Sequence, residues 1–208
     1  MNSEQIIDFL KTDIRKYESP ERYGHTLSVL GECVYLADVF GVAGDDRLCL
    51  MIAALCHDIT KEMPDDESRA FCTRHGIKYV DSPVLHQDTA PAFIVEKYGD
   101  IPEIVDKRVL SAVSLHTTGS PVMSVCDMIL FVADFIEPTR KYEDCKKARE
   151  YIRSECEKIS KNKEAADVKI LCDAVVSISR NTLDHLKKRG REIDQRTVET
   201  ASKGVCVG

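Results

Sequence analysis

The sequence predicts an all-α protein folded as a single helical bundle. Apolar residues recur mostly three and four positions apart, which is the period of a helix buried along one face. The alternation typical of strands is scarcely visible, and the chain contains no Asn-Gly or Asp-Gly hairpin signal. Only ten glycines and seven prolines interrupt the 208 residues. Long amphipathic helices joined by short breaks are therefore expected.

Apolar stripes and helix breakers place the elements in order. A first helix is expected over about 3–16, with Ser3 as its N-cap. The next two are expected over about 21–40 and 45–57, separated by Gly41 and Gly44. Further helices are predicted from Pro64 to His75, from Ser82-Pro83 onward, from Pro102 to Leu115, over 122–136, and as two helices over about 142–189 that divide near Lys161–Lys163.

Size and charge limit the organisation and the partners. The length fits one domain, which we place at residues 1–190, with residues 191–208 as a loosely attached C-terminal tail. A net charge of −6 gives no general attraction to nucleic acid or to an anionic membrane. An anionic ligand would therefore need a local cluster of cations or a metal.

The first residues and the cysteines indicate a cytoplasmic protein. The N-terminus lacks the basic and apolar regions of a signal peptide. No apolar run approaches the roughly 18–20 residues that span a bilayer. The nine cysteines include no Cys-x-x-Cys pair and several lie in apolar helical patterns, which is typical of reduced core thiols.

An apolar helix over 45–57 ends in His57-Asp58, two adjacent metal-binding side chains. Imidazole and carboxylate groups are costly to bury unless they are paired or bind a cation. An isolated His-Asp dipeptide is more often an ordinary polar helix end. Here His25 lies upstream at the start of another helix, and Asp134 lies downstream inside the apolar run Met128–Ile136. The pattern indicates a metal site gathered from three helices.

Asp134 is the most informative acid, because an ionised carboxylate among apolar neighbours needs a partner. A buried salt bridge or a helix cap is the ordinary alternative to a metal. Imidazole and carboxylate ligands without thiolate suit iron, manganese, cobalt, nickel or zinc. The type of ligand does not choose among these metals.

Several cationic or titratable side chains follow the candidate ligands. Lys61 lies one helical turn beyond Asp58, and Arg140 follows the helix that carries the downstream acid. As isolated residues, both would be exposed on the surface. With His86 and His116, they are the groups able to neutralise phosphate oxygens in an acidic protein. The two histidines either face the phosphates or hold a second metal bridged by Asp58, and both interpretations stay open.

The order His25, His57-Asp58, Asp134 resembles that of the HD-domain phosphohydrolases, which are all-helical metal-dependent enzymes. The segments most similar to the YqeK-type branch of that superfamily are residues 22–25, 53–61, 85–86, 116–119 and 133–140. Members of this branch are symmetrical bis(5′-nucleosyl)-tetraphosphatases. The resemblance implies an HD-domain bundle and an iron-type site of one or two ions, with His25, His57, Asp58 and Asp134 as ligands. It also implies that His86, His116, Thr117 and Arg140 bind the substrate.

Two features depart from that branch. Gln87 stands where the branch is expected to have glycine. The tail around residues 193–197 also differs from the expected pattern, so no residue there is given a role.

The resemblance implies hydrolysis of diadenosine tetraphosphate to two ADP, with Asp58 and Lys61 as catalytic residues. The residues alone indicate only hydrolysis of a nucleotide or a phosphate ester. One alternative is an HD-type hydrolase of another nucleotide, such as a mono- or triphosphate or a guanosine alarmone. The other is a non-catalytic nucleotide-binding HD module, against which the complete ligand set argues. By analogy with other helical HD proteins, we expect a homodimer.

Overall fold

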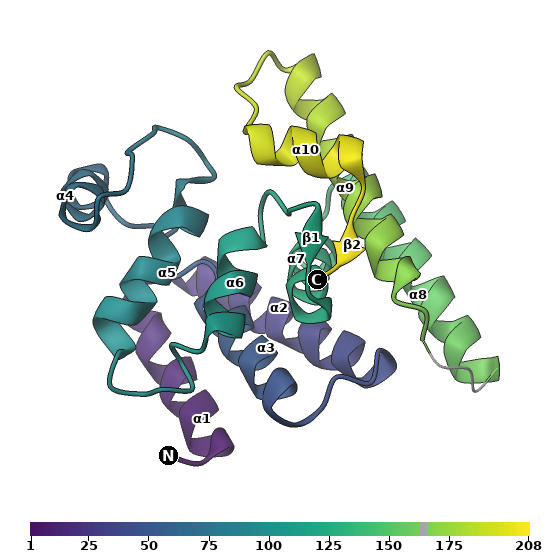
Figure 1. The fold of residues 1–208 in the computed structure, drawn as a ribbon, viewed down its shortest axis with the longest axis horizontal. Helices are drawn as coiled ribbons and strands as arrows, with labels where there is room; N and C mark the ends of the chain where they lie inside the picture. The colour runs from purple at the N-terminus through teal and green to yellow at the C-terminus, as the bar shows by residue number, and fades with distance from the viewer. Residues whose placement is uncertain (163–165) are drawn as a thin grey trace.

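The computed structural model describes residues 1–162 and 166–208, and within these ranges it contains ten α-helices, which confirms the all-α prediction (Figure 1). The helices are α1 (Ser3–Asp13), α2 (Pro20–Val39), α3 (Gly44–Cys56), α4 (Asp65–His75), α5 (Leu85–Tyr98), α6 (Lys107–Leu115), α7 (Val125–Ile136), α8 (Glu143–Asn162), α9 (Lys169–Lys188) and α10 (Gln195–Lys203). One 3-10 turn, η1 (Ile14–Lys16), continues α1, and two short strands, β1 (Val122–Met123) and β2 (Cys206–Val207), pair in parallel. Among the described residues, no helix is both long and apolar enough to cross a membrane.

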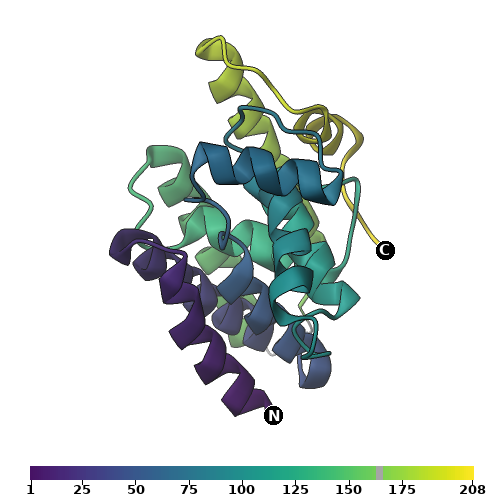
Figure 2. The same cartoon turned by 90° about the vertical axis from the view of Figure 1, so that its left-hand side faces the viewer.

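The core forms around α7, which packs against α2, α3, α6 and α9. Nine of its twelve residues are buried, so this helix is surrounded on most sides. The α2 and α3 helices also pack against each other, and α1 covers α3 (Figure 2). The helices that supply the predicted ligands therefore meet at the centre of the molecule.

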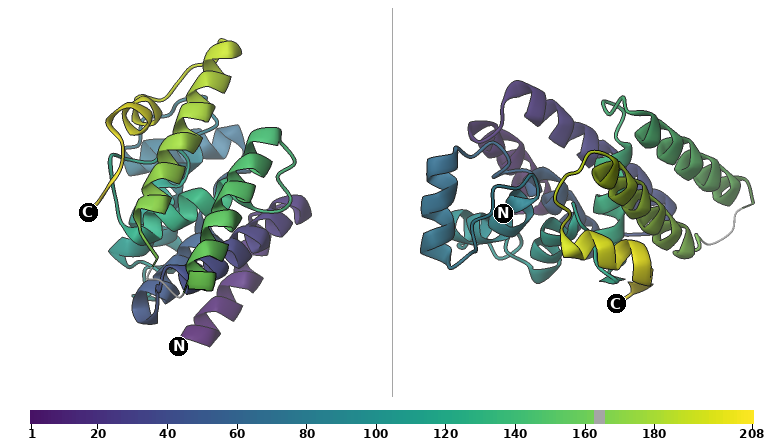
Figure 3. Two further views of the ribbon diagram at one scale, coloured as in Figure 1. Left: turned by 90° about the vertical axis from the view of Figure 1, so that its right-hand side faces the viewer. Right: turned by 90° about the horizontal axis from the view of Figure 1, so that it is seen from above.

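The remaining helices flank this core on opposite sides. On one side, α4 lies away from the main body and contacts α5 (Figure 1). On the other side, α8 and α9 run side by side along α7 (Figure 3). We expected these two helices to divide near Lys161–Lys163. In the structure α8 ends at Asn162 and α9 begins at Lys169, and Lys163 lies outside the described residues.

Several helices begin at different residues from those expected, because side-chain caps decide the ends. Asn2, rather than Ser3, caps α1 in a capping box with Gln5. The helix expected from Pro102 begins at Lys107, where the Asp106 side chain accepts from a backbone N–H in the first turn. Similarly, Ser124 caps α7, so the preceding residues are free to form β1.

The C-terminal segment is folded against the bundle, which differs from the loosely attached tail that we expected. The α10 helix packs on α9 and buries Thr197, Thr200 and Ala201. Arg196 binds both carboxylate oxygens of Asp88 on α5, at 2.5 and 3.0 Å, and β2 pairs with β1. A short helix with a small, mostly hydroxyl-bearing buried face leaves no apolar stripe in the sequence, which is why the pattern did not predict it.

Candidate metal centre

Three helix ends bring the predicted ligands together. His25 lies near the start of α2, which Ser19 caps and Pro20 begins. His57-Asp58 directly follow α3, and Asp134 lies in the last turn of α7. The structure therefore gathers all four predicted ligand residues at the junction of the three core helices.

We call His25, His57, Asp58 and Asp134 the first group. The Nε2 atom of His25 lies 3.7 Å from Asp58 Oδ2 and 3.0 Å from Asp134 Oδ1. The Nε2 atom of His57 lies 3.6 and 4.0 Å from the same two oxygens. Two imidazole nitrogens and two carboxylate oxygens thus face a common point.

We call Asp58, His86 and His116 the second group. Asp58 Oδ1 lies 3.2 Å from His86 Nε2 and 3.6 Å from His116 Nε2, and the two Nε2 atoms are 2.9 Å apart. Asp58 therefore presents one oxygen to each group. The three ligand atoms of the second group lie close enough together to hold one ion, as do those of His25, His57 and Asp58.

The hydrogen bonds of the imidazole rings leave nitrogen atoms available to a metal. His57 Nδ1 donates to Ala54 O at 2.8 Å, and His116 Nδ1 donates to Val113 O at 2.6 Å. The Nε2 atom of His57 is buried and has no hydrogen-bond partner within residues 1–162 and 166–208, and the buried Nε2 atom of His25 faces the carboxylates of Asp58 and Asp134. A buried polar atom without a partner costs about 1–3 kcal/mol. The residues present therefore fit a divalent metal, which would satisfy these atoms.

The charges in the first group compensate one another. Burial by itself would lower the pKa of His25, but Asp134 and Glu137 outweigh it and raise that pKa to about 9. Burial would raise the pKa of Asp58 and Asp134, yet interactions with His57, His116 and His86 hold the pKa of Asp58 well below its usual range. Arg140 and His25 do the same for the pKa of Asp134. Both carboxylates are therefore ionised at neutral pH, as metal binding requires.

In His57 and His86, burial dominates and lowers each pKa to about 4. Both rings are therefore neutral at pH 7. A neutral imidazole is the form that binds a metal.

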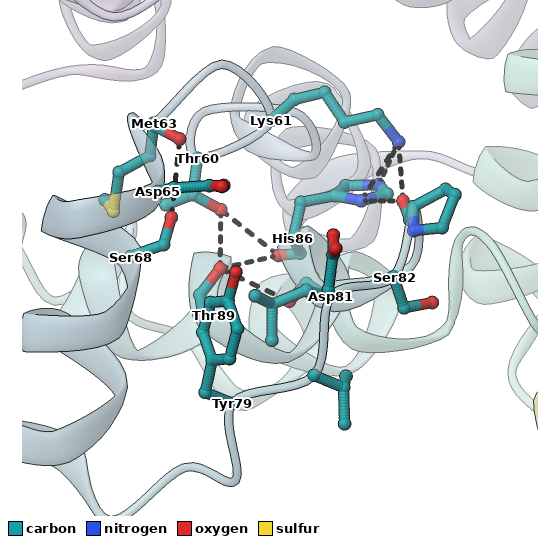
Figure 4. Close-up of a pocket in the computed structure, with 13 residues that line it drawn as sticks. Thr60, Lys61, Met63, Asp65, Ser68, Tyr79, Asp81, Ser82, His86 and Thr89 are labelled. Carbon is teal, nitrogen blue, oxygen red and sulfur yellow. Dashed lines mark hydrogen bonds between the residues drawn. The ribbon is translucent and has the colours of Figure 1, made fainter.

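A pocket of about 310 Å³ has Asp58, Asp134, His86 and His116 in its walls, and three cations border it. Arg22 donates to Asp58 Oδ2 at 2.7 Å, and Arg140 reaches back to donate to Asp134 Oδ1 at 2.5 Å. Lys61 points its Nζ atom at His86 Nδ1 and at the Pro83 carbonyl, both 3.0 Å away (Figure 4). Burial lowers the pKa of Lys61. Positive charge thus surrounds an opening beside the clustered ligands.

The loop after α6 forms another wall of the pocket. The Thr117 hydroxyl lies 3.2 Å from His86 Nε2 and 3.0 Å from His116 Nε2. Gln87, where a glycine was expected, is fully buried, and its amide bonds the backbone N–H and the hydroxyl of Thr118. Gln87 therefore holds the loop in place rather than facing the pocket.

The C-terminal helix supports the same loop. The Thr200 hydroxyl on α10 donates to Thr118 O at 3.1 Å. Gly119 follows at φ +66°, and a Cβ there would lie 3.0 Å from the Thr200 methyl group. Glycine is thus required where the loop meets α10.

Two site residues were not predicted as site residues. Arg22 contacts Asp58 as described, and the fully buried Glu137 accepts from His25 Nδ1 at 3.2 Å. Arg22 lies three residues before His25 on α2, and Glu137 lies three residues after Asp134, directly after the end of α7. This spacing is the signal that could have found them. A carboxylate behind a ligating histidine fixes the orientation of the ring.

Comparisons with known proteins agree with this geometry. Residues 22–139 match the HD domain family. The symmetrical bis(5′-nucleosyl)-tetraphosphatase of Halalkalibacterium halodurans is 28% identical over 204 residues, covering 96% of this chain and 95% of that protein. The protein of the same name from Bacillus subtilis is 26% identical over 196 residues, covering 93% and 92%.

A solved structure supports the fold. The crystal structure of a predicted HD superfamily hydrolase involved in NAD metabolism from Clostridium acetobutylicum superposes with a TM-score of 0.72 at 24% identity, covering 94% of this chain and 95% of that one. The family match spans more than half of the chain and includes both groups. The chain belongs to the HD domain family.

Proposed function

We propose that this protein is a metal-dependent hydrolase that cleaves diadenosine tetraphosphate symmetrically into two ADP. The observation that carries the proposal is the Asp58 carboxylate, shared by two histidine groups at the mouth of a pocket bordered by Arg22, Lys61 and Arg140. The names of the relatives from H. halodurans and B. subtilis, which align over more than nine-tenths of the chain, support the substrate.

The proposed metal is iron, held by the first group, His25, His57, Asp58 and Asp134. A second ion would be held by Asp58, His86 and His116, whose short nitrogen–nitrogen distance of 2.9 Å favours a shared proton or cation. The open alternative is that the two histidines face the phosphates. A bound divalent metal would supply an acidified water and would polarise a phosphoryl oxygen.

In the proposed reaction, the oxygen of water bonds to one of the two inner phosphorus atoms. The central P–O bond breaks, and the bridging oxygen leaves with the second ADP. Asp58 orients the attacking water, and Lys61 neutralises the leaving diphosphate. Arg22, Arg140 and the Thr117 hydroxyl bind the other phosphate oxygens.

The direct test is to incubate metal-loaded protein with diadenosine tetraphosphate and separate the products by chromatography. ADP is expected as the sole nucleotide product. Production of AMP and ATP would contradict symmetrical cleavage, and absence of turnover would contradict the hydrolase. A panel of nucleoside mono- and triphosphates and guanosine alarmones, compared by kcat/KM, is expected to rank below the dinucleotide.

Three finer features remain predictions with their own measurements. Metal analysis of anaerobically purified protein is expected to find iron at one or two equivalents. Light scattering is expected to find a homodimer, and cell fractionation is expected to place the protein in the cytoplasm.

A further inference from the structure

A cavity of about 380 Å³ lies beside the metal pocket, between the start of α8 and the end of α9. We call it the α8–α9 cavity. Its volume falls within the roughly 300–1,000 Å³ typical of small-molecule sites. It is lined by Phe135, Arg140, Tyr142, Glu143, Asp144, Cys145, Asn181, Thr182, His185, Leu186 and Arg189.

This cavity adjoins the metal pocket. The two share Phe135, Arg140 and Thr182 in their walls. Phe135 directly follows Asp134, and the Arg140 guanidinium binds the carboxylate and the backbone carbonyl of that residue. A ligand with phosphates at Arg140 would therefore place its next chemical group in the α8–α9 cavity.

The lining of the cavity suits a nucleoside. The Tyr142 side chain is 74% exposed, and Phe135 presents a second, half-buried aromatic ring. Aromatic faces bind bases by stacking. The carboxylate of Asp144 and the amide of Asn181 can bond ribose hydroxyls or the exocyclic amino group of adenine.

The other two cavities beside the metal pocket fit a nucleoside less well. The one behind Lys61 and His86 has a mostly polar lining, and its volume of about 130 Å³ is too small for a base and its sugar (Figure 4). The one beyond Arg22 and His25 is larger but more polar, because three glutamates and three cations line it. It shares Tyr142 with the α8–α9 cavity, whereas Phe135 does not line it, so it offers a base less aromatic surface.

We propose that the α8–α9 cavity binds one adenine nucleoside of the dinucleotide, with the base against Tyr142 and Phe135. This inference rests on the proposed function of the metal pocket. The substrate then lies with its phosphates between the cationic residues and one nucleoside between α8 and α9.

A fluorescent reporter tests this placement directly. The chain contains no tryptophan, so Tyr142→Trp introduces a single indole into the cavity wall. In metal-loaded protein, ADP is expected to quench this indole, whereas pyrophosphate, which lacks a base, is expected to leave it unchanged. Tyr151→Trp, at a partly exposed tyrosine of α8 outside the cavity, is the matched control and should respond to neither ligand. Equal responses to ADP and pyrophosphate, or no response to ADP, would overturn the placement.

Inhibition kinetics provide a second measurement that does not depend on the reporter. Tyr142→Ala is expected to raise the inhibition constant of ADP about tenfold, since stacking on an aromatic ring contributes on the order of 1–3 kcal/mol per base. The inhibition constant of pyrophosphate, which lacks a base, should stay unchanged, and kcat/KM for the dinucleotide should fall together with the affinity for ADP. An unchanged constant for ADP would contradict the proposal.

The two proposals fail separately. If the wild type cleaves diadenosine tetraphosphate but ADP does not quench the reporter, the nucleoside site is wrong and the hydrolase stands. If ADP quenches the reporter but the wild type does not cleave the dinucleotide, the nucleoside site stands and the hydrolase is wrong.

Discussion

The two groups that share Asp58 are built on different parts of the fold. The first group comes from the ends of α2, α3 and α7, which pack against one another in the core. The second group takes His86 from the first turn of α5 and His116 from the end of α6. Core packing therefore holds the first group, whereas the second group, although α6 also packs on α3 and α7, depends in addition on contacts of a loop and of the C-terminal segment.

The two groups also differ in what orients their rings. In the first, Glu137 lies behind His25, and Arg149 of α8 fixes the loop after Glu137 by donating to the carbonyls of Ile136 and Glu137. In the second, Gln87 and Thr200 hold the Thr118 backbone beside His116. We infer that changes in the C-terminal segment act on the second group and leave the first intact.

The largest loss of activity is expected when Asp58, which both groups share, is changed. Asp58→Asn keeps the shape of the side chain but removes the charge shared by both groups. We expect kcat/KM for the dinucleotide to fall by about 1,000-fold or more, since metal-assisted charge stabilisation contributes several kcal/mol and each 1.36 kcal/mol is tenfold in rate.

Metal content should fall together with activity in this variant. Asp13→Asn, at a buried carboxylate bonded to Tyr98 outside the metal pocket, is the control and should keep both. Full activity in Asp58→Asn would rule out catalysis at this carboxylate.

The next effect separates the two groups. His57→Gln is expected to lose the metal of the first group and to reduce kcat by about 100-fold or more, because His57 is a proposed ligand with a free buried nitrogen. His116→Gln is expected to retain one equivalent. Metal analysis after dialysis measures both. A wild type that holds one ion, with His116→Gln unchanged in metal content, would assign the second group to phosphate binding instead.

The site residues that could be predicted are those whose immediate sequence neighbours make them stand out. His25, His57, Asp58 and Asp134 each stand beside or within an apolar stripe, where a polar side chain is conspicuous. Their convergence was inferred from this pattern and from the resemblance to a family, and the core helices α2, α3 and α7 bring them together.

The contacts that hold the second group could not be predicted in the same way. Gln87 and Thr118 are 31 residues apart, and Thr118 and Thr200 are 82 apart. Hydroxyl and amide side chains leave no periodic pattern, so only the folded chain shows which of them meet. The position of α10 could not be predicted for the same reason.

The opposite pKa shifts of the histidines predict a stability maximum near pH 6.5 in chelator-treated protein. Below pH 6.5 the unfolded chain takes up protons on His57 and His86, whereas the folded chain resists until about pH 4, so stability falls with acidification. Above pH 6.5 the unfolded chain has lost the proton that folded His25 retains to about pH 9, so stability falls again.

Urea midpoints between pH 4 and 9 measure this profile. His57→Gln removes one of the two rings that resist protonation, so its midpoint should fall less than that of the wild type between pH 6.5 and 4. An identical acid-side fall in both proteins would mean that His57 is not the ring responsible.

The smallest effect tests whether α10 supports the second group. Thr200→Val keeps the shape of the side chain and removes the hydroxyl that donates to Thr118 O and Arg196 O. We expect a loss of about 1 kcal/mol in unfolding free energy, the usual net contribution of a hydrogen bond. We also expect a fall of about tenfold in kcat, the size of effect seen when residues that orient metal ligands are changed. Thr12→Val, which removes an exposed hydroxyl bonded to Asp8 O on α1, is the control and should leave kcat unchanged. If Thr200→Val lowers stability and leaves kcat intact, α10 packs against the bundle without positioning His116, and the two groups are equally independent of the C-terminal segment.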